Sequence, residues 1–371
     1  MKVLYHAPPP GAPTGVADYA ETLLEGLRGV APANAGSDVP VYHLGNNRLH
    51  RDIYACALAT PGVVVLHDAV LHHFLLGALS AAGYVEEFVY NYGEWSRHLG
   101  EELWRERDAA SVDPRYFRYP MLRRAVESAR AVIVHNPGAA EIARRHGAGN
   151  IRVIPHFFEP RDVPDGFAIE RFRGRIGVAP GSTLFGIFGY LRETKRLAPC
   201  IGTFRRLNAV RPDTALLIAG ETVSGDLARL LAGEGAHPAI RRLGHLSDGD
   251  FRVAAASVDC CLNLRYPAAG ETSGIAIRLM GIGKPVIVTE GPETADMPAT
   301  ACLRVPAGVD EAAVLFDQMA LIAEYPAIAR RIGAEAAEHI RARHSLASAV
   351  KQYWQVIESV MDSAGGLTFD P

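Results

Sequence analysis

The sequence predicts an α/β protein made of two domains, each built on a parallel β-sheet, and three observations lead to this fold class. Short apolar runs such as 62–67 (GVVVLH) and 131–136 (AVIVHN) lack alternation, which is typical of strands buried on both faces of a parallel sheet. Longer helical patterns separate these runs, as the crossovers of such a sheet require. A length of 371 residues with 49% hydrophobic residues suits two well-packed domains.

The expected strands fall into two groups, separated by a Pro- and Asp-rich segment at 157–182. The strands predicted for the first group are 2–6, 40–44, 63–67, 130–135 and 151–155. Those predicted for the second group are 184–188, 214–219, 258–263, 285–289 and 301–304. Helices are expected at 15–28, 138–146, 196–209 and 310–323, and again within 326–362. We therefore place the domains at 1–160 and 161–345, and expect a C-terminal helix, 346–371, to pack back toward the first domain.

Charge and composition exclude several classes of protein. A formal net charge of -3 gives no electrostatic reason to expect nucleic acid as a partner. Five scattered cysteines without a C-x-x-C pair favour free thiols in a reducing cytosol, so we expect a cytoplasmic protein. The N-terminus lacks a signal-peptide pattern. Histidines and an aspartate interrupt the most apolar region, 57–83, so no transmembrane helix is predicted.

The first candidate site is 270–274 (GETSG), which lies between a strand and a helix that starts near Gly274. Exposed N–H groups and the positive end of the helix dipole favour an anion such as a diphosphate there. The hydroxyls of Thr272 and Ser273 add donors, and Glu271 can accept hydrogen bonds from sugar hydroxyls. An ordinary helix cap is an equally good interpretation of Thr272 and Ser273 taken alone.

The second candidate site is the polar turn that follows the strand ending at Gly189. It carries Arg192, Lys195 and Arg196 into the next helix, and cations at the carboxyl end of a strand suit a phosphate-bearing ligand. A solvated charged turn is the alternative interpretation.

Two further candidates lie in the first domain. His67 directly follows an apolar strand, where an imidazole can bind a sugar hydroxyl, although a lone His there is usually structural. A metal site made of His67, His72 and His73 has no supporting carboxylate spacing. Gly15 begins a second helix after a Pro/Gly loop. That loop lacks the spacing of a dinucleotide fingerprint or a P-loop, so NAD and ATP have no specific support.

Taken together and in this order, these segments resemble the retaining glycosyltransferases of family 4, which have the GT-B fold, over nearly the whole chain. The resemblance includes Thr14-Gly15, His67, 132–143 (VIVHNPGAAEIA), 151–158 (IRVIPHFF), 188–197 (FGYLRETKRL), 216–221 (LLIAGE) and 240–251 (IRRLGHLSDGDF). The most specific part is 270–288 (GETSGIAIRLMGIGKPVIV), which is similar to the family's Glu-x7-Glu segment.

The resemblance implies two Rossmann-like domains facing across a cleft, with a nucleotide-sugar donor bound mainly by the second domain and a hydroxyl acceptor by the first. It implies transfer with retention of configuration, and neither a metal nor another cofactor. UDP is the commonest nucleotide in the family and GDP comes next. Lys195 falls where the family has its diphosphate-binding Lys, and His67 where it has a His that contacts the donor sugar.

The sequence departs from the family at three positions. The two glutamates should fall at 270 and 278, where this chain has Gly270 and Arg278, so that the first carboxylate is displaced to Glu271. Arg278 cannot accept hydrogen bonds from ribose, and is expected to contact phosphate or a carboxylate. Tyr190 replaces the usual Arg after Gly189, which leaves Arg192 or Arg196 as substitutes. A non-catalytic GT-B protein that binds nucleotide or glycan, and a GT-B phosphorylase or epimerase, remain alternatives.

Only residues 95–130 give information about the acceptor. They combine aromatic residues with many arginines. Some family members dock on membranes through such a region. The charges here are mixed, which favours a solvated helical pair lining the acceptor cleft. A small molecule, a lipid-linked acceptor and a growing glycan all remain open.

Overall fold

The computed structural model describes residues 4–30 and 39–365, and side chains up to residue 361. The chain divides into two compact units, which are described separately. The first unit contains residues 1–157, 267–272 and 344–371, and the second contains residues 158–266 and 273–343. The segment 267–272, which the sequence analysis included in the second domain, therefore belongs to the first unit.

The first unit contains a five-stranded parallel sheet in the order β1-β2-β3-β4-β5. Its strands are β1 (Leu4–His6), β2 (Pro40–Leu44), β3 (Val63–Leu66), β4 (Ala131–Val134) and β5 (Ile151–Val153). One face is covered by α1 (Gly15–Val30) and α16 (Leu346–Gly365), and the other by helices that include α2 (Arg51–Ala59) and α8 (Pro137–Arg145). Successive residues of β3 point to opposite cores, Val63 and Val65 to one and Val64 and Leu66 to the other, so apolar residues are needed throughout the strand.

A group of short helices is inserted between β3 and β4. These are α3 (His72–Ala78), α4 (Ala81–Tyr92), α5 (Arg97–Arg105), α6 (Arg115–Arg118) and α7 (Arg123–Glu127). The region 95–130 thus forms several short helices rather than one pair. Many of its cations are neutralised locally: Arg115 pairs with Glu102, Glu106 and Asp113, and Arg124 pairs with Glu87.

The second unit contains a six-stranded parallel sheet in the order β11-β10-β9-β6-β7-β8. Its strands are β6 (Thr183–Phe188), β7 (Thr214–Ala219), β8 (Ile240–Leu243), β9 (Cys260–Asn263), β10 (Val286–Thr289) and β11 (Leu303–Val305). The chain starts at β6, adds β7 and β8 on one side, and then crosses to β9 on the other side. The strand order therefore reverses between β6 and β9, and ligands of open α/β sheets bind at such a point.

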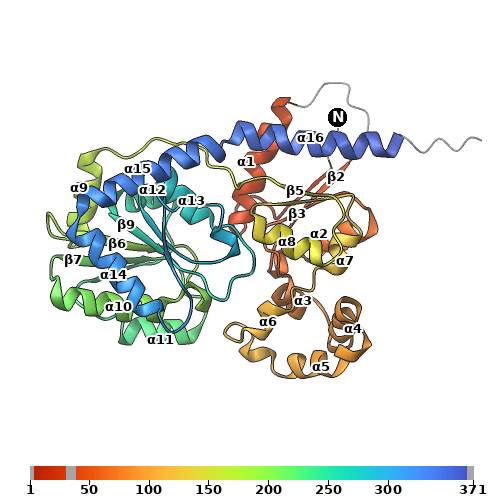
Figure 1. Ribbon diagram of the computed structural model, residues 1–371, viewed down its shortest axis with the longest axis horizontal. Coiled ribbons are helices and arrows are strands. Elements are labelled where there is room, and N and C mark those ends of the chain that lie inside the picture. Colours follow the sequence, from red (N-terminus) through yellow and green to blue (C-terminus); the bar gives the residue numbers. More distant parts are fainter. Residues whose placement is uncertain (1–3, 31–38, 366–371) are drawn as a thin grey trace, which may run out of the picture. The chain divides into compact units, whose positions relative to one another are not determined.

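Helices cover both faces of the second sheet (Figure 1). One face is packed by α10 (Leu197–Val210), α11 (Gly225–Gly233) and α14 (Glu311–Glu324), and the other by α9 (Gly166–Arg175), α12 (Asp248–Ser257), α13 (Gly274–Gly281) and α15 (Pro326–Arg343). Both units are thus Rossmann-like, and the predicted pair of parallel-sheet domains is confirmed.

The ten predicted strands all form, with ends within two residues of the prediction; positions 2 and 3 of the first lie outside the described residues. The strand β8 was missed. Its sequence, Ile-Arg-Arg-Leu, has two arginines because it lies at the edge of the sheet, where side chains reach solvent.

Among the described residues, no single helix is both long and apolar enough to cross a membrane. The helices α14 and α15 meet that criterion only as a pair, and they are bent by 104° relative to each other.

Candidate functional site

At the carboxyl end of β6, a glycine allows three elements of the second unit to meet. Gly189 has a φ of +85°, and a Cβ placed on it would lie 3.5 Å from Ile275 Cγ1 of α13 and 3.6 Å from the Lys195 amine. Gly220, which follows β7, is closer still: its Cβ would lie 2.0 Å from the carbonyl oxygen of Gly189. Glycine is therefore required at 220, and the ends of β6 and β7 and the start of α13 converge.

Lys195 is a buried cation at this point. It lies in the short 3-10 helix η4 (Glu193–Lys195), only 7% of it is exposed, and its amine donates a 2.5 Å hydrogen bond to the carbonyl of Phe188, the last residue of β6. An ammonium group held against the end of a strand at a sheet's switch point is well placed to bind a negatively charged ligand.

The other two predicted cations of this turn have different surroundings. Arg196 binds the buried carboxylate of Glu311 through two nitrogens, at distances from 2.8 to 3.1 Å. Its φ of +57° is left-handed, which is unusual for a residue other than glycine, and the ion pair with Glu311 offsets that cost. Arg192 is exposed and directly precedes η4.

The helix predicted to start near Gly274 does start there, and Ser273 is its N-cap. The Ser273 hydroxyl accepts a hydrogen bond from the backbone N–H of Ala276 and donates one to the side chain of Asn263 at the end of β9. The capping interpretation is thus confirmed for Ser273. The N–H groups of Gly274 and Ile275 belong to the first turn, where the helix itself provides no acceptor. Arg278 lies further along α13, with its guanidinium 5.7 Å from the ring of Phe251.

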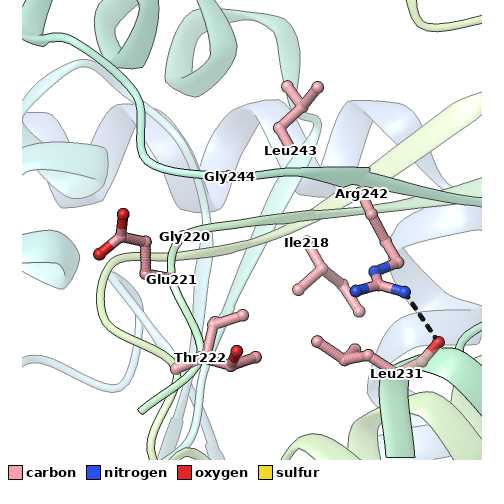
Figure 2. A pocket seen from close by; sticks show the side chains of 9 residues that line it. Ile218, Gly220, Glu221, Thr222, Leu231, Arg242, Leu243 and Gly244 are labelled. Carbon is pink, nitrogen blue, oxygen red and sulfur yellow. Dashed lines mark hydrogen bonds between the residues drawn. The ribbon is translucent and has the colours of Figure 1, made fainter. Parts of the chain in front are cut away.

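A pocket of about 530 Å³ adjoins this region at the carboxyl ends of β7 and β8 (Figure 2). Figure 2 shows the Arg242 guanidinium donating to the Leu231 carbonyl, at 3.1 Å, with Glu221 on the opposite side of the pocket. The sequence predicts no role for these residues. The lining consists of Leu191, Ile218, Gly220, Glu221, Thr222, Leu231, Arg242, Leu243 and Gly244.

In the first unit, His67 follows β3 and lies in a cluster of histidines. Its Nε2 is 2.9 Å from Nδ1 of His43, and its ring centre is 5.0 Å from those of Tyr19 and His135. Burial, together with the neighbouring imidazoles, holds the pKa of His67 well below its ordinary value. His67 is therefore neutral near pH 7.

A signal for this cluster is present in the sequence and was missed. Each strand of the first sheet has a histidine among its last two residues or within three residues after its end: His6, His43, His67, His135 and His156. The carboxyl ends of parallel strands share one edge of the sheet, which brings the rings of His43, His67, His135 and His156 together.

The alternative of a metal site at His67, His72 and His73 is not supported by the geometry. His72 binds the Tyr119 carbonyl and the Tyr84 hydroxyl, and His73 binds the Ala110 carbonyl and the Asn46 side chain. Within the described part of the chain, no three His, Cys, Asp or Glu side chains are grouped so as to hold a metal ion.

The segment that carries Glu271 is fixed to the first unit by hydrogen bonds. The carbonyl of Ala269 accepts from the backbone N–H groups of Ala69 and Val70, at 2.8 and 3.0 Å, just after His67. Asn136, the N-cap of α8, uses its amide N–H groups for the carbonyl of Gly270 and the hydroxyl of Thr272, both at 3.0 Å. Glu271 itself accepts a 2.7 Å bond from the Ala269 N–H.

The structure thus brings Glu271, Thr272 and His67 into one unit, and Gly189, Lys195 and Gly274 into the other. Asn136, which holds the segment 267–272, had no predicted role, although an Asn-Pro pair after a strand is a recognisable helix start.

The segment 267–272 approaches Ala69 so closely that position 270 requires a glycine. Gly270→Ala is therefore expected to lower the free energy of unfolding by about 2 kcal/mol. Its φ is +75°, and a Cβ would lie 2.6 Å from the Cβ of Ala69. Urea unfolding followed by tryptophan fluorescence measures the effect. Gly15→Ala is the matched control, because its Cβ would meet nothing within 4 Å at the start of α1. Equal stability of the two variants would contradict the expectation.

Comparison with known proteins gives structural relatives alone: no family model matches the sequence, and no curated protein matches it. Anabaena HepE in complex with UDP-glucose is similar with a TM-score of 0.63 at 15% identity, covering 93% of this chain and 82% of that one. Sucrose-phosphate synthase from Thermosynechococcus elongatus has a TM-score of 0.63 at 17% identity, with coverages of 92% and 79%.

WaaG, a glycosyltransferase involved in lipopolysaccharide biosynthesis, has a TM-score of 0.59 at 15% identity, covering 94% of this chain and 85% of that one. At these identities the likeness concerns the fold. The chain therefore has the GT-B fold of two Rossmann-like parallel-sheet units, as its sequence predicts.

Proposed function

We propose that this protein is a glycosyltransferase that moves a sugar from a nucleoside-diphosphate sugar to a hydroxyl acceptor. The observation that carries the proposal is the convergence around Gly189 of a buried cation, a helix start and, through Gly220, a pocket. This convergence lies at the carboxyl edge of the second sheet, where the strand order reverses. The fold shared with HepE, which is described in complex with UDP-glucose, supports it.

The donor is assigned to the second unit. A pocket of about 530 Å³ is of a size that accepts a nucleoside. The diphosphate is assigned to Lys195 and to the N–H groups at the start of α13, with the exposed Arg192 as a further cation. UDP is the preferred nucleotide in this proposal, and GDP is the next. Arg196 supports the turn through Glu311.

Departure of the nucleoside diphosphate leaves negative charge on phosphate and positive charge at the anomeric carbon. Lys195 and the helix start stabilise the leaving group in the role that a divalent ion has in other enzymes, so the proposal requires no metal and no cofactor. His67 and Glu271 are assigned to positioning the donor sugar. The departing phosphate deprotonates the acceptor hydroxyl on the same face, which gives retention without a covalent nucleophile.

The family, the cellular location and the class of acceptor are also part of the proposal. We assign the protein to the family 4 type and to the cytoplasm, with a small molecule, a lipid-linked molecule or a glycan as acceptor and no nucleic acid partner. The local pairing of charges in 95–130 favours a solvated surface over peripheral membrane contact there. Flotation with anionic liposomes tests this point: co-migration of the protein would contradict it.

Calorimetric titration with UDP, GDP, ADP and dTDP, first without metal and then with magnesium, tests the proposal. Micromolar binding of one nucleotide without metal is the expected result, and Lys195→Met should weaken it. Binding of none would count against a donor site in this protein. Nucleotide binding that appears only when magnesium is present would overturn the metal-independent mechanism.

A non-catalytic GT-B protein that binds a nucleotide is the second candidate, and the position of Arg278 favours it. This residue stands where the family has its second glutamate, and its guanidinium packs on the ring of Phe251. Tight nucleotide binding without hydrolysis or transfer to any acceptor would support this candidate. Phosphorolysis of a glycoside without nucleotide would instead identify a phosphorylase.

A further inference from the structure

Two histidines on neighbouring strands of the first unit share a single hydrogen bond. His43, in β2, is fully buried, and its Nδ1 lies 2.9 Å from Nε2 of His67, which follows β3. The two rings are stacked, with centres 5.2 Å apart and an angle of 26° between their planes. A neutral imidazole has one N–H and one lone pair, so the direction of this bond fixes the tautomers of both residues.

The second nitrogen of His43 decides the direction. His43 Nε2 is buried and has no hydrogen-bond partner among the described residues. A proton on that nitrogen would be a buried donor without an acceptor, which costs about 1–3 kcal/mol. Buried acceptors without a partner are more common in proteins than buried donors without one, which favours a bare lone pair at this place. His43 therefore carries its proton on Nδ1 and donates it to Nε2 of His67, which leaves the His67 proton on Nδ1.

The neighbouring histidines follow the same rule. His50 and His135 each have Nδ1 at 2.9 Å from a backbone carbonyl, that of His43 and that of Ile154. A carbonyl only accepts, so both residues carry their proton on Nδ1, and for both the buried Nε2 has no hydrogen-bond partner in the described part of the chain. His43, His50 and His135 thus each direct their single N–H at a fixed acceptor within the first unit.

Neutrality of the pair is consistent with its surroundings. Burial and the nearby His135 and His50 lower the pKa of His43 to about 3. Burial lowers the pKa of His67 as well, together with His135, His43, His156 and His50. The ring of Tyr19 lies edge-on to that of His67, with centres 5.0 Å apart, and its phenol is held by Tyr353 of α16.

We propose that His43 is a positioning residue that fixes His67 as the neutral Nδ1–H tautomer. His67 then offers its ligand an N–H donor rather than a lone pair, and so selects a sugar oxygen that accepts a hydrogen bond. This inference rests on the proposed function only for the identity of the ligand. The tautomer itself follows from the contacts of His43.

The tautomer can be observed directly in the full chain labelled with 15N-histidine, by two-bond 1H–15N correlation spectra at pH 7. His67→Gln assigns the signals of His67. We expect a neutral ring protonated on Nδ1 for both His67 and His43. A His67 ring protonated on Nε2, or charged, would overturn the proposal, and this outcome needs no variant of His43.

Two substitutions of His43 test the positioning. His43→Asn keeps an amide donor near the place of Nδ1, whereas His43→Leu removes it. We expect His43→Leu to shift His67 toward the Nε2–H tautomer and to lower kcat about tenfold, the equivalent of one hydrogen bond, with His43→Asn close to the wild type. An unchanged tautomer and kcat in a folded His43→Leu protein would refute the role of His43.

The two failures are distinguishable. If no acceptor is glycosylated but His67 carries its proton on Nδ1, the proposed function fails and the tautomer assignment stands. If transfer is measured but His67 is protonated on Nε2, the tautomer assignment fails and the function stands.

Discussion

Lys195→Met is expected to lower kcat/KM for sugar transfer by about 10²–10³-fold, which is typical for the loss of one group that stabilises transition-state charge. Lys195 is buried and is directed at the end of β6 by its bond to the Phe188 carbonyl. Methionine keeps the unbranched apolar chain and removes the charge, so the packing around it is conserved while the leaving diphosphate loses its cation.

The measurement is initial-rate kinetics with the donor that calorimetry identifies, alongside thermal unfolding of each variant. Lys351→Met is the matched control, because Lys351 is exposed on α16 and removal of its charge should leave turnover unchanged. Near-normal turnover of a folded Lys195→Met protein would end the assigned role. If Lys195→Met weakens nucleotide binding and also lowers turnover, the charge of Lys195 stabilises the bound donor as well as the transition state.

Acidification is expected to destabilise the first unit steeply between pH 7 and pH 5. Burial lowers the pKa of His43 and of His72 to about 3, and that of His135 to about 4, whereas an unfolded histidine titrates near its ordinary value of 6.5. Below pH 6.5 the unfolded chain binds protons that the folded chain does not, so stability falls as the pH falls toward the folded pKa values. Each of these three histidines is expected to lower the free energy of unfolding by about 2 kcal/mol at pH 5.

Urea unfolding at pH 7, 6 and 5, followed by tryptophan fluorescence, measures this loss. The three tryptophans, Trp95, Trp104 and Trp354, all belong to the first unit, so the signal reports on that unit. His98 is the matched control, since 83% of its side chain is exposed and His98→Gln should keep the full pH dependence. His43→Asn should reduce the slope of the free energy of unfolding against pH by the equivalent of about one proton. A stability independent of pH over this range would show that these histidines are not held neutral in the folded protein.

The sequence by itself determined the class of fold and most of its elements. Segments such as 63–66 and 215–219 are apolar on both faces because both faces are buried, and this pattern needs no knowledge of the partner strands. The strand β8 was not predicted, because an edge strand that contains Arg241 and Arg242 lacks this apolar pattern. The start of α13 was predictable because Ser273 and Gly274 act locally, through a cap three residues long.

The arrangement of the candidate site was decided by the tertiary structure. Asn136 binds Gly270, which is 134 residues away, and Arg196 binds Glu311, which is 115 residues away. Neither partner is marked in the local sequence, because any carbonyl or carboxylate satisfies the same donor. The pairing of His43 with His67 likewise depends on which strands are neighbours in the sheet. Local patterns report the burial and the backbone conformation of a residue, whereas the partner of a polar side chain is fixed only when distant segments of the chain are packed together.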